Sequence, residues 1–288
     1  MREKTTYDCQ SITPLFLGGA DNDIAELRVP SIKGLLRFWW RAIVGLPIKS
    51  LQKKEGEIFG SSEEGVGRSN FSIRLVAEKE PVRKNHLMLP HKRRSFTKEG
   101  ITVDQEFSLI LSSLKGNHQN YSEILQASLL LGGIGKRSRR GFGSIKISSI
   151  NGKASTFDYS LKSILQLINS IKDDYRIVDG KIKLKAQRNL KKRYPFLKEI
   201  ELSKEPLSSW KEVVEKIGWA THHYAREDAI GIGRGKQRLA SPIYISTIKK
   251  APNEYFPIVS TLETVFKNKK TTQRHYEKQE EFKEEILS

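Results

Sequence analysis

Residues 132–143 read Gly132-Gly-Ile-Gly-Lys-Arg-Ser-Arg-Arg-Gly-Phe-Gly143, with five glycines, four basic side chains and no acidic residue. A leucine-rich helical pattern at 125–131 precedes it, and an alternating apolar-polar pattern at 144–148 follows it. We therefore expect a loop that leads from a helix into a strand. Glycine lets a backbone approach a ligand closely, and lysine and arginine attract phosphate. The composition predicts a loop that lies against a nucleic-acid backbone.

The glycine loop predicts contacts with phosphate rather than with stacked bases. Arg140-Gly-Phe-Gly143 matches the opening of the RNA-recognition-motif consensus, but Ser144 and Ile147 stand where that consensus has aromatic residues. A flexible surface loop with incidental charge is the alternative. The residues predicted to contact RNA here are Gly132, Gly133, Gly135, Lys136, Arg137, Arg139, Arg140, Gly141, Phe142 and Gly143.

The charge balance of the whole chain favours a polyanionic partner. The 288 residues include 51 Lys and Arg against 33 Asp and Glu, a formal net charge of +18. No segment approaches the roughly 18 apolar residues of a membrane span, and the amino terminus lacks the apolar core of a secretory signal. The single cysteine, Cys9, excludes internal disulfides and multi-cysteine metal sites and suits a reducing cytoplasm. We expect a cytoplasmic protein that binds nucleic acid and no membrane.

The first half of the chain has the pattern of a split βαβ unit. Strands are expected at 6–17, 70–77, 104–114 and 144–150, and helices at 32–44 and 121–131, the first with Ser31 as its N-cap. The order strand, helix, strand, strand, helix, strand is that of a ferredoxin-like domain, here 1–152. Such a sheet presents one face to a ligand, as RNA-recognition domains do.

The second half repeats one element of the first. A second glycine-basic loop, 231–238, runs into an apolar strand, 239–245, about 95 residues after the first such loop. We interpret this as a degenerate duplication, which predicts an α+β fold of two tandem ferredoxin-like domains, the second at 153–288. Helices are expected at 158–171 and 208–226, and the last twenty residues as a solvated helix or frayed tail. The predicted RNA contacts of this loop are Arg234, Lys236 and Arg238.

A basic stripe follows the first predicted helix. Lys33, Arg37 and Arg41 are spaced by four residues, and no acidic residue lies between Glu26 and Glu55. A solvated helix face usually mixes signs, so the stripe favours an anionic partner. Trp39 and Trp40 are adjacent on this helix and project in different directions, so we expect them to differ in burial, with either one free to stack on a base.

The histidines are weak candidates for catalysis. His222 and His223 precede the second glycine loop, and a histidine can act as acid or base at neutral pH. Adjacent histidines on a helix point about 100° apart, however, and are poorly placed to flank one phosphate. Polar packing or RNA contact is the better interpretation, and His91 is the third candidate. No spacing typical of a metal site or cofactor site is present, so we predict none.

A long insert, 79–103, matches no known pattern. Its segment 81–98 carries six basic residues and predicts either a disordered arm that becomes ordered on RNA or a solvated loop: Arg83, Lys84, Lys92, Arg93, Arg94 and Lys98.

Several strings resemble a known family. Thr13-Pro-Leu-Phe-Leu-Gly-Gly19 and Leu27-Arg-Val-Pro-Ser-Ile-Lys-Gly-Leu-Leu-Arg-Phe-Trp-Trp-Arg41 look like the opening of the first subunit of the Cmr (type III-B) CRISPR effector complex. Ile58-Phe-Gly-Ser61 and Arg238-Leu-Ala-Ser-Pro-Ile-Tyr244 also fit that pattern, and the loop at 132–143 is similar to the glycine-rich loop of the RAMP superfamily. The resemblance implies two ferredoxin-like domains in a multi-subunit ribonucleoprotein, bound to RNA near the 3′ portion of the guide. It also implies a structural role, with target cutting left to other subunits.

The sequence as a whole predicts a non-catalytic RNA-binding subunit of such a complex. Its partners would be guide RNA, target RNA or both, together with other Cmr subunits. Two alternatives stay open: a metal-independent endoribonuclease of the same superfamily, and a protein scaffold with little direct RNA contact. We also expect an Arg139→Glu/Arg140→Glu variant to lose RNA affinity while unfolding normally.

Overall fold

The computed structural model describes residues 2–21, 23–63, 65, 67–92, 96–188, 194–232, 238–264 and 272–288, and it is a mixed α/β structure with antiparallel sheets. The first half contains β1 (Arg2–Ser11), α1 (Val29–Val44), α2 (Ile48–Phe59), β2 (Phe71–Val76), β3 (Arg83–Leu87), β4 (Thr97–Ile101), β5 (Glu106–Leu114), α3 (His118–Leu131), β6 (Ile145–Ile150) and β7 (Lys153–Ala154). The second half contains α4 (Leu161–Ile171), β8 (Tyr175–Val178), β9 (Lys181–Leu184), β10 (Phe196–Leu202), α5 (Trp210–His223), β11 (Ile243–Ala251), β12 (Glu254–Glu263) and α6 (Gln273–Leu287).

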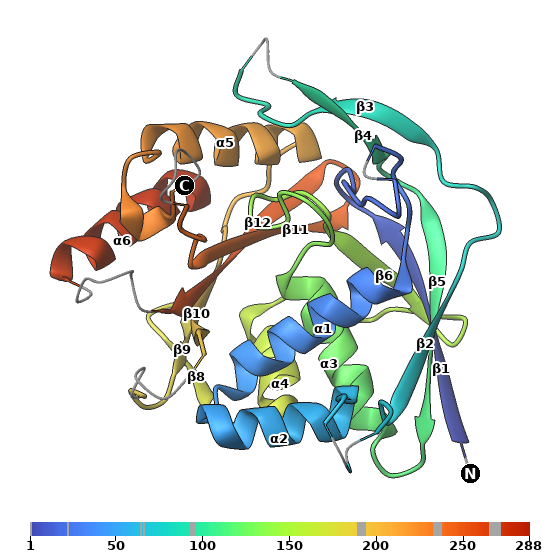
Figure 1. Cartoon of the computed structure of the whole chain (residues 1–288). Helices are drawn as coiled ribbons and strands as arrows, with labels where there is room; N and C mark the ends of the chain where they lie inside the picture. The colour runs from blue at the N-terminus through green and yellow to red at the C-terminus, as the bar shows by residue number, and fades with distance from the viewer. Residues whose placement is uncertain are drawn as a thin grey trace.

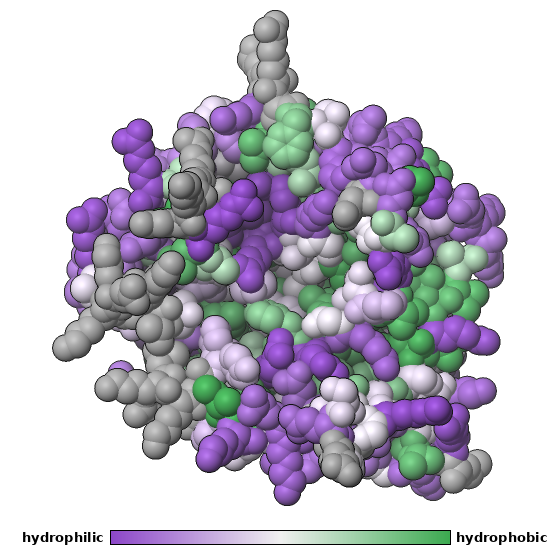
Figure 2. Space-filling view, viewed as in Figure 1, coloured by the Kyte–Doolittle hydropathy of each residue, from purple (hydrophilic) through white to green (hydrophobic). Residues whose placement is uncertain are grey.

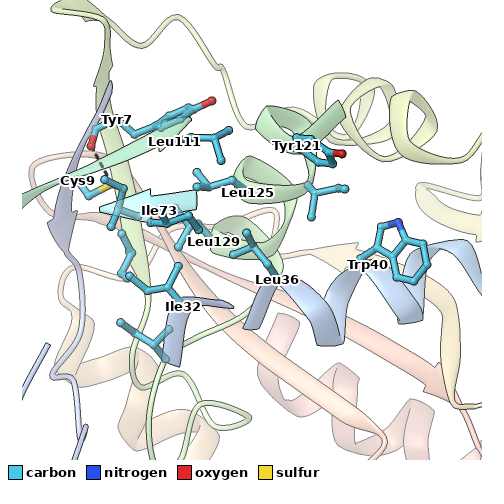
Figure 3. Packing of buried hydrophobic residues seen from close by; sticks show 14 of the residues in the cluster. Tyr7, Cys9, Ile32, Leu36, Trp40, Ile73, Leu111, Tyr121, Leu125 and Leu129 are labelled. Carbon is cyan, nitrogen blue, oxygen red and sulfur yellow. Dashed lines mark hydrogen bonds between the residues drawn. The ribbon is translucent and has the colours of Figure 1, made fainter. Parts of the chain in front are cut away.

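The first sheet has the strand order β2-β5-β1-β6-β7, and its alternating side chains separate a buried face from an open one. Tyr7 and Cys9 of β1 pair with Leu109 and Phe107 of β5, and all four are buried. Figure 3 shows side chains of α1 and α3 directed toward this face. Because inward positions alternate with outward ones along a strand, the open face carries residues such as Asp8 of β1 and Ser108 and Ser112 of β5.

The second sheet has the order β11-β12-β10-β9-β8 and is covered on both faces. Along β11, Tyr244 and Ile248 pack with residues of α1 and α4, whereas Ile243 and Ile245 pack with residues of α5 and α6. A strand covered on both faces reads as a continuous apolar run, which is why the sequence at 239–245 lacks alternation. Figure 1 shows α5 and α6 on one side of this sheet and α1 and α3 on the other.

Helix α1 belongs to two hydrophobic cores. Trp40 packs in the core of the first sheet, and Trp39 packs in the core of the second. They are 3% and 0% exposed, so the expectation that the two tryptophans differ in burial is wrong. The two side chains do project in different directions, but each direction leads into a core because the helix lies between the two sheets (Figure 1).

The insert at 79–103 contains an ordered hairpin, so neither expected form describes it. Strands β3 and β4 pair from Arg83↔Ile101 to Leu87↔Thr97. Met88, just after β3, is buried with Phe16, Phe142 and Val214. The hairpin therefore packs against both halves of the chain, and Figure 1 shows it beside α5. Arg93 and Arg94 lie outside the described residues.

Helices and strands occur where the sequence predicts them, with differences at their ends. The helix expected at 32–44 begins at Val29, with Arg28 as its N-cap and Pro30 in the first turn, so Ser31 is not the cap. The strand expected at 6–17 ends at Ser11. Of the two forms expected for the last twenty residues, the helix is present as α6, but it is not simply solvated because its Phe282 and Ile286 are fully buried. No helix in the described ranges is long and apolar enough to cross a membrane.

Candidate nucleic-acid interface

The glycines of the loop at 132–143 are needed by the packing of this chain itself. A Cβ on Gly133 would lie 2.2 Å from the carbonyl oxygen of Phe142, and one on Gly143 would lie 2.2 Å from that of Ile134. Gly143 also has a φ of +78°, which side-chain-bearing residues rarely adopt. Phe142 is 1% exposed and packs on the ring of Phe16. The expectation that Phe142 and these glycines open the backbone to a ligand is therefore corrected.

Arg140 is held by the protein. Its guanidinium donates hydrogen bonds to the carbonyl oxygens of Arg139, Ile243 and Ile230, at 3.0, 3.1 and 3.2 Å. It also lies 5.7 Å from the ring centroid of Phe282. Burial, with Arg137 and Arg139 nearby, lowers the pKa of Arg140. The expected orientation of this side chain toward phosphate is wrong, because its donors already bind backbone carbonyl oxygens of the glycine loop and of the second half.

The other three basic residues of the loop differ in how firmly they are held. Arg139 lies 4.6 Å from the ring centroid of Tyr244 and donates to the carbonyl oxygen of Ser241 at 3.2 Å. Lys136 is exposed. Arg137 is half-buried with a φ of +61°, and its Nε has no hydrogen-bond partner among the described residues. Lys136 thus keeps donors that a ligand can use, and Arg137 has a buried donor that no described group satisfies.

A cleft of about 480 Å³ lies beside the loop, and we call it the arginine cleft. No described aspartate or glutamate lines it, and no described carboxylate forms an ion pair with Arg137, Arg139 or Arg140. Figure 2 shows hydrophilic side chains around a hollow on this face, between α5 and α1. The titratable residues that line the cleft are His91, Lys92, Arg137, Arg139, Arg140, His222 and Tyr224.

The stripe on α1 lines a second, larger cleft of about 790 Å³, which we call the helix cleft. Glu55 of α2 reaches both Arg37 and Arg41, at 3.3 Å from each, and Arg37 also donates to the carbonyl oxygen of Gly60. The stripe is therefore partly neutralised, contrary to the sequence-based expectation. Lys33 lies 5.2 Å from the ring centroid of Phe71, and burial together with Arg37 lowers its pKa.

Two further basic segments are the second glycine-basic loop, at 231–238, and the segment 181–193, which holds seven basic residues. Arg234 and Lys236 lie outside the described residues, and Arg238 is exposed at the start of the following segment. In the basic run, the four described members each form an ion pair with a carboxylate: Lys181, Lys183, Lys185 and Arg188. These four described residues are therefore compensated by carboxylates of the chain itself.

The histidines are brought together in a way that the sequence spacing conceals. His91, beyond β3, stacks on His222 of α5 with ring centroids 5.2 Å apart. His223 instead approaches Glu285 of α6, with Nδ1 3.1 Å from the carboxylate. The neighbours in sequence are therefore separated, and two residues 131 positions apart share the arginine cleft.

A cluster of three carboxylates lies elsewhere, among Glu199, Glu201 and Glu280. The ammonium group of Lys283 lies 2.5, 2.5 and 2.7 Å from their oxygens, and Lys181 lies 2.7 Å from Glu201 and 2.9 Å from Glu280. Lysine thus occupies the position that a cation would take, and the cluster is part of the packing of α6.

Two residues that shape the interface were not predicted from the sequence. Glu55 neutralises part of the stripe from a neighbouring helix, and Tyr244 supports Arg139 from β11. Glu55 bounds the acid-free segment, and its position fourteen residues after Arg41 gives no sign of contact. Tyr244 stands in an apolar strand and is indistinguishable there from a core residue.

Comparison with known proteins places this geometry in a family. The model of the RAMP superfamily matches residues 8–146. The CRISPR system Cmr subunit Cmr1-2 of Pyrococcus furiosus is 31% identical over 185 residues, covering 50% of this chain and 95% of that protein. The subunit Cmr1-1 of the same organism is 25% identical over 301 residues, covering 90% of this chain and 88% of that protein.

Solved structures share the fold. The apo crystal structure of Cmr1 from Pyrococcus furiosus matches with a TM-score of 0.62 and 21% identity over 99% of this chain and 96% of that chain. A chain of the type III-B Cmr-beta complex bound to cognate target RNA matches with a TM-score of 0.63 and 13% identity, covering 99% of each chain. Because the 31% identical relative is matched over almost its whole length, this chain belongs to the Cmr1 subunits of the RAMP superfamily.

Proposed function

We propose that this chain is a non-catalytic RNA-binding subunit of a type III-B CRISPR ribonucleoprotein in the cytoplasm. It would contact the backbone of guide RNA, target RNA or both near the 3′ end of the guide, together with other Cmr subunits. Its relationship to Cmr1 subunits supports the assembly, and its likeness to a chain of the Cmr-beta complex bound to cognate target RNA supports the ligand.

One observation carries the RNA-binding proposal. In the described part of the chain, Arg137, Arg139 and Arg140 gather at one cleft with no carboxylate lining it. Cations grouped without counter-charge raise the local concentration of a polyanion and repel one another when it is absent. Phosphate contacts carry no sequence information, which suits a subunit that must accept guides of any sequence.

The strand orders support a ferredoxin-like character for both halves, with the division near 152. The first sheet has the order β2-β5-β1-β6, in which the outer strands flank a central pair as in a split βαβ unit. In the second sheet, β11-β12-β10-β9 repeats that order if β9 takes the place of the final strand. The second half would then be a permuted version of the first.

A second candidate function has one observation in its favour. His91 and His222 meet beside three arginines, and metal-independent RNA cleavage uses such acid-base groups. Incubating the purified chain with labelled RNA in EDTA tests this candidate. Specific cleavage that disappears in His91→Ala and in His222→Ala would replace the non-catalytic proposal.

Ultraviolet crosslinking of the assembled complex tests the proposal itself. Peptides that contain 132–143 should carry crosslinked RNA. If only other subunits crosslink, the chain is a protein scaffold instead. In filter binding with single-stranded RNA, log K should fall with log salt by about 0.7 for each phosphate contacted. A flat dependence would contradict the electrostatic mechanism.

A further inference from the structure

The arginine cleft collects basic groups from three separate elements. Arg137 comes from the glycine loop, Lys92 from the segment after β3, and His222 from α5. His91 stacks on His222, and no described carboxylate lines the cleft. Because each element brings the same sign of charge, the packing between them is opposed by repulsion until an anion enters.

Arg137 is held in position without a described partner. Its backbone has a φ of +61°, a conformation that costs free energy for any residue with a Cβ. Its Nε is shut off from solvent and has no partner among the described residues, and burial lowers its pKa. A half-buried guanidinium with unused donors is a group that a phosphate can satisfy in two-point contact.

His91 is oriented so that one ring nitrogen is usable. Its Nδ1 faces Gly218 of α5, where an added Cβ would lie 2.8 Å away, and it has no described hydrogen-bond partner. Nδ1 therefore faces the protein, which leaves Nε2 as the ring nitrogen for a ligand in the cleft. Burial, and then His222, Lys92 and Arg137, lower the pKa of His91.

We propose that the arginine cleft is a site for a single phosphate group, bound by Arg137, His91 and His222. Lys92, Arg139 and Arg140 add charge around it, and Tyr224 lines its edge. An anion in the cleft stabilises the protonated form of His91, so binding takes up a proton and strengthens as the pH falls. This inference rests on the proposed RNA-binding function in one respect only, namely that the phosphate belongs to an RNA chain and is not free phosphate.

The pH dependence of RNA binding tests the site. Filter binding of an oligouridylate at fixed ionic strength should show affinity rising roughly three- to tenfold from about pH 8 to pH 6. The variant His91→Gln/His222→Gln should lose most of this rise. His223→Gln is the matched control, since His223 is adjacent to His222 but approaches Glu285 outside the cleft, and it should keep the rise. Equal pH profiles in wild type and the double variant would overturn the proposal.

A second measurement separates this inference from the proposed function. Inorganic phosphate should raise the Tm of the wild-type chain and of Arg74→Gln, an exposed arginine on β2, but not that of Arg137→Gln. RNA binding without any effect of phosphate or of the histidines would overturn the site and leave the RNA-binding function standing. A phosphate effect confined to wild type and control, with no RNA binding, would support the site and contradict the RNA carrier.

Discussion

Trp39 and Trp40 are neighbours in the chain, yet they are buried in two different hydrophobic cores. The helix that carries them is packed from both sides: Trp40 meets Phe59 edge-on, and Trp39 meets Tyr244 of the second sheet. Because one helix contributes large side chains to both cores, neither core is complete without it. The two halves of the protein are therefore coupled through α1.

This coupling predicts that the protein unfolds as one unit. Trp39→Ala and Trp40→Ala should each lower the free energy of unfolding by about 3–5 kcal/mol, because each leaves a cavity in a core. Each variant should also still unfold in a single transition, shifted to lower temperature or denaturant concentration, rather than in two transitions. Calorimetry and denaturant unfolding, followed by circular dichroism, measure both effects. Two resolved transitions in either variant would show that the halves fold independently.

Two basic residues of the glycine loop should affect different properties: Arg140 the stability of the protein, and Lys136 its RNA binding. Arg140→Gln should lower the free energy of unfolding by about 2–4 kcal/mol, because three carbonyl oxygens lose their donor. Lys136→Gln should change stability by less than about 0.5 kcal/mol and reduce the salt slope of RNA binding by about 0.7. Denaturant titration and filter binding measure the two. Unchanged stability in Arg140→Gln would mean that its bonds to the second half contribute nothing. An unchanged salt slope in Lys136→Gln would remove this lysine from the RNA contacts.

Glu55 limits the positive charge of the helix cleft. Glu55→Gln removes the carboxylate shared by Arg37 and Arg41, so RNA affinity should rise if the stripe contacts phosphate. The expected change is about threefold to tenfold at low salt, and it should diminish as salt is added. Filter binding at two salt concentrations measures it, with Glu63→Gln in the same cleft as a control that lacks an ion pair among the described residues. No change in Glu55→Gln would place the RNA away from this helix.

The ion cluster around Lys283 should make the stability of the protein depend on pH. Burial alone would lower the pKa of Lys283, but Glu199 and Glu201 outweigh it and raise that pKa above 10.5. Burial alone would raise the pKa of Glu280, but Lys283 and Lys181 outweigh it and lower that pKa below 4.5. The stabilising contribution of the cluster is therefore complete between about pH 4.5 and 10.5. It is lost as the pH falls through the folded pKa of Glu280 or rises through that of Lys283.

Lys283→Met should lower the free energy of unfolding at neutral pH by about 3–5 kcal/mol, because it leaves buried carboxylates short of a partner. As the pH falls from about 7 to 5, protonation relieves their repulsion, so the variant should gain stability there while the wild type does not. Denaturant unfolding across this range measures the difference. Parallel pH profiles for the two proteins would show that the ion cluster is not coupled to folding.

The sequence predicted most local elements of the first half, though not α2, because periodicity is a local property. The strands at 71–76 and 106–114 and the helices at 29–44 and 118–131 follow from alternation and helical spacing within short windows. The insert hairpin was missed because β3 contains Lys84, Asn85 and His86 rather than alternating apolar residues. Its order comes from packing against residues far away in the chain, such as Phe16 and Val214.

The candidate site was predictable in composition but not in geometry. The glycine loop was identified from its residues, yet the role of Arg140 depends on the carbonyl oxygens of Ile243 and Ile230, which lie 103 and 90 residues away in sequence. Arg140 and Arg137 are arginines of the same loop, and the sequence does not distinguish their roles. Only the hydrogen bonds to the carbonyl oxygens of Ile230 and Ile243 make Arg140 a structural residue. The contact of His91 with His222 likewise follows from the hairpin lying on α5.

Composition and periodicity establish that the chain is basic, that it joins helices to strands through glycine-rich turns, and that its cations gather in particular segments. The folded chain shows which of those cations meet a carboxylate, which bind the chain's own carbonyl groups and which are left for a ligand. Charge and periodicity are local properties of the sequence, whereas electrostatic compensation depends on which segments, remote in sequence, come within a few ångströms of one another.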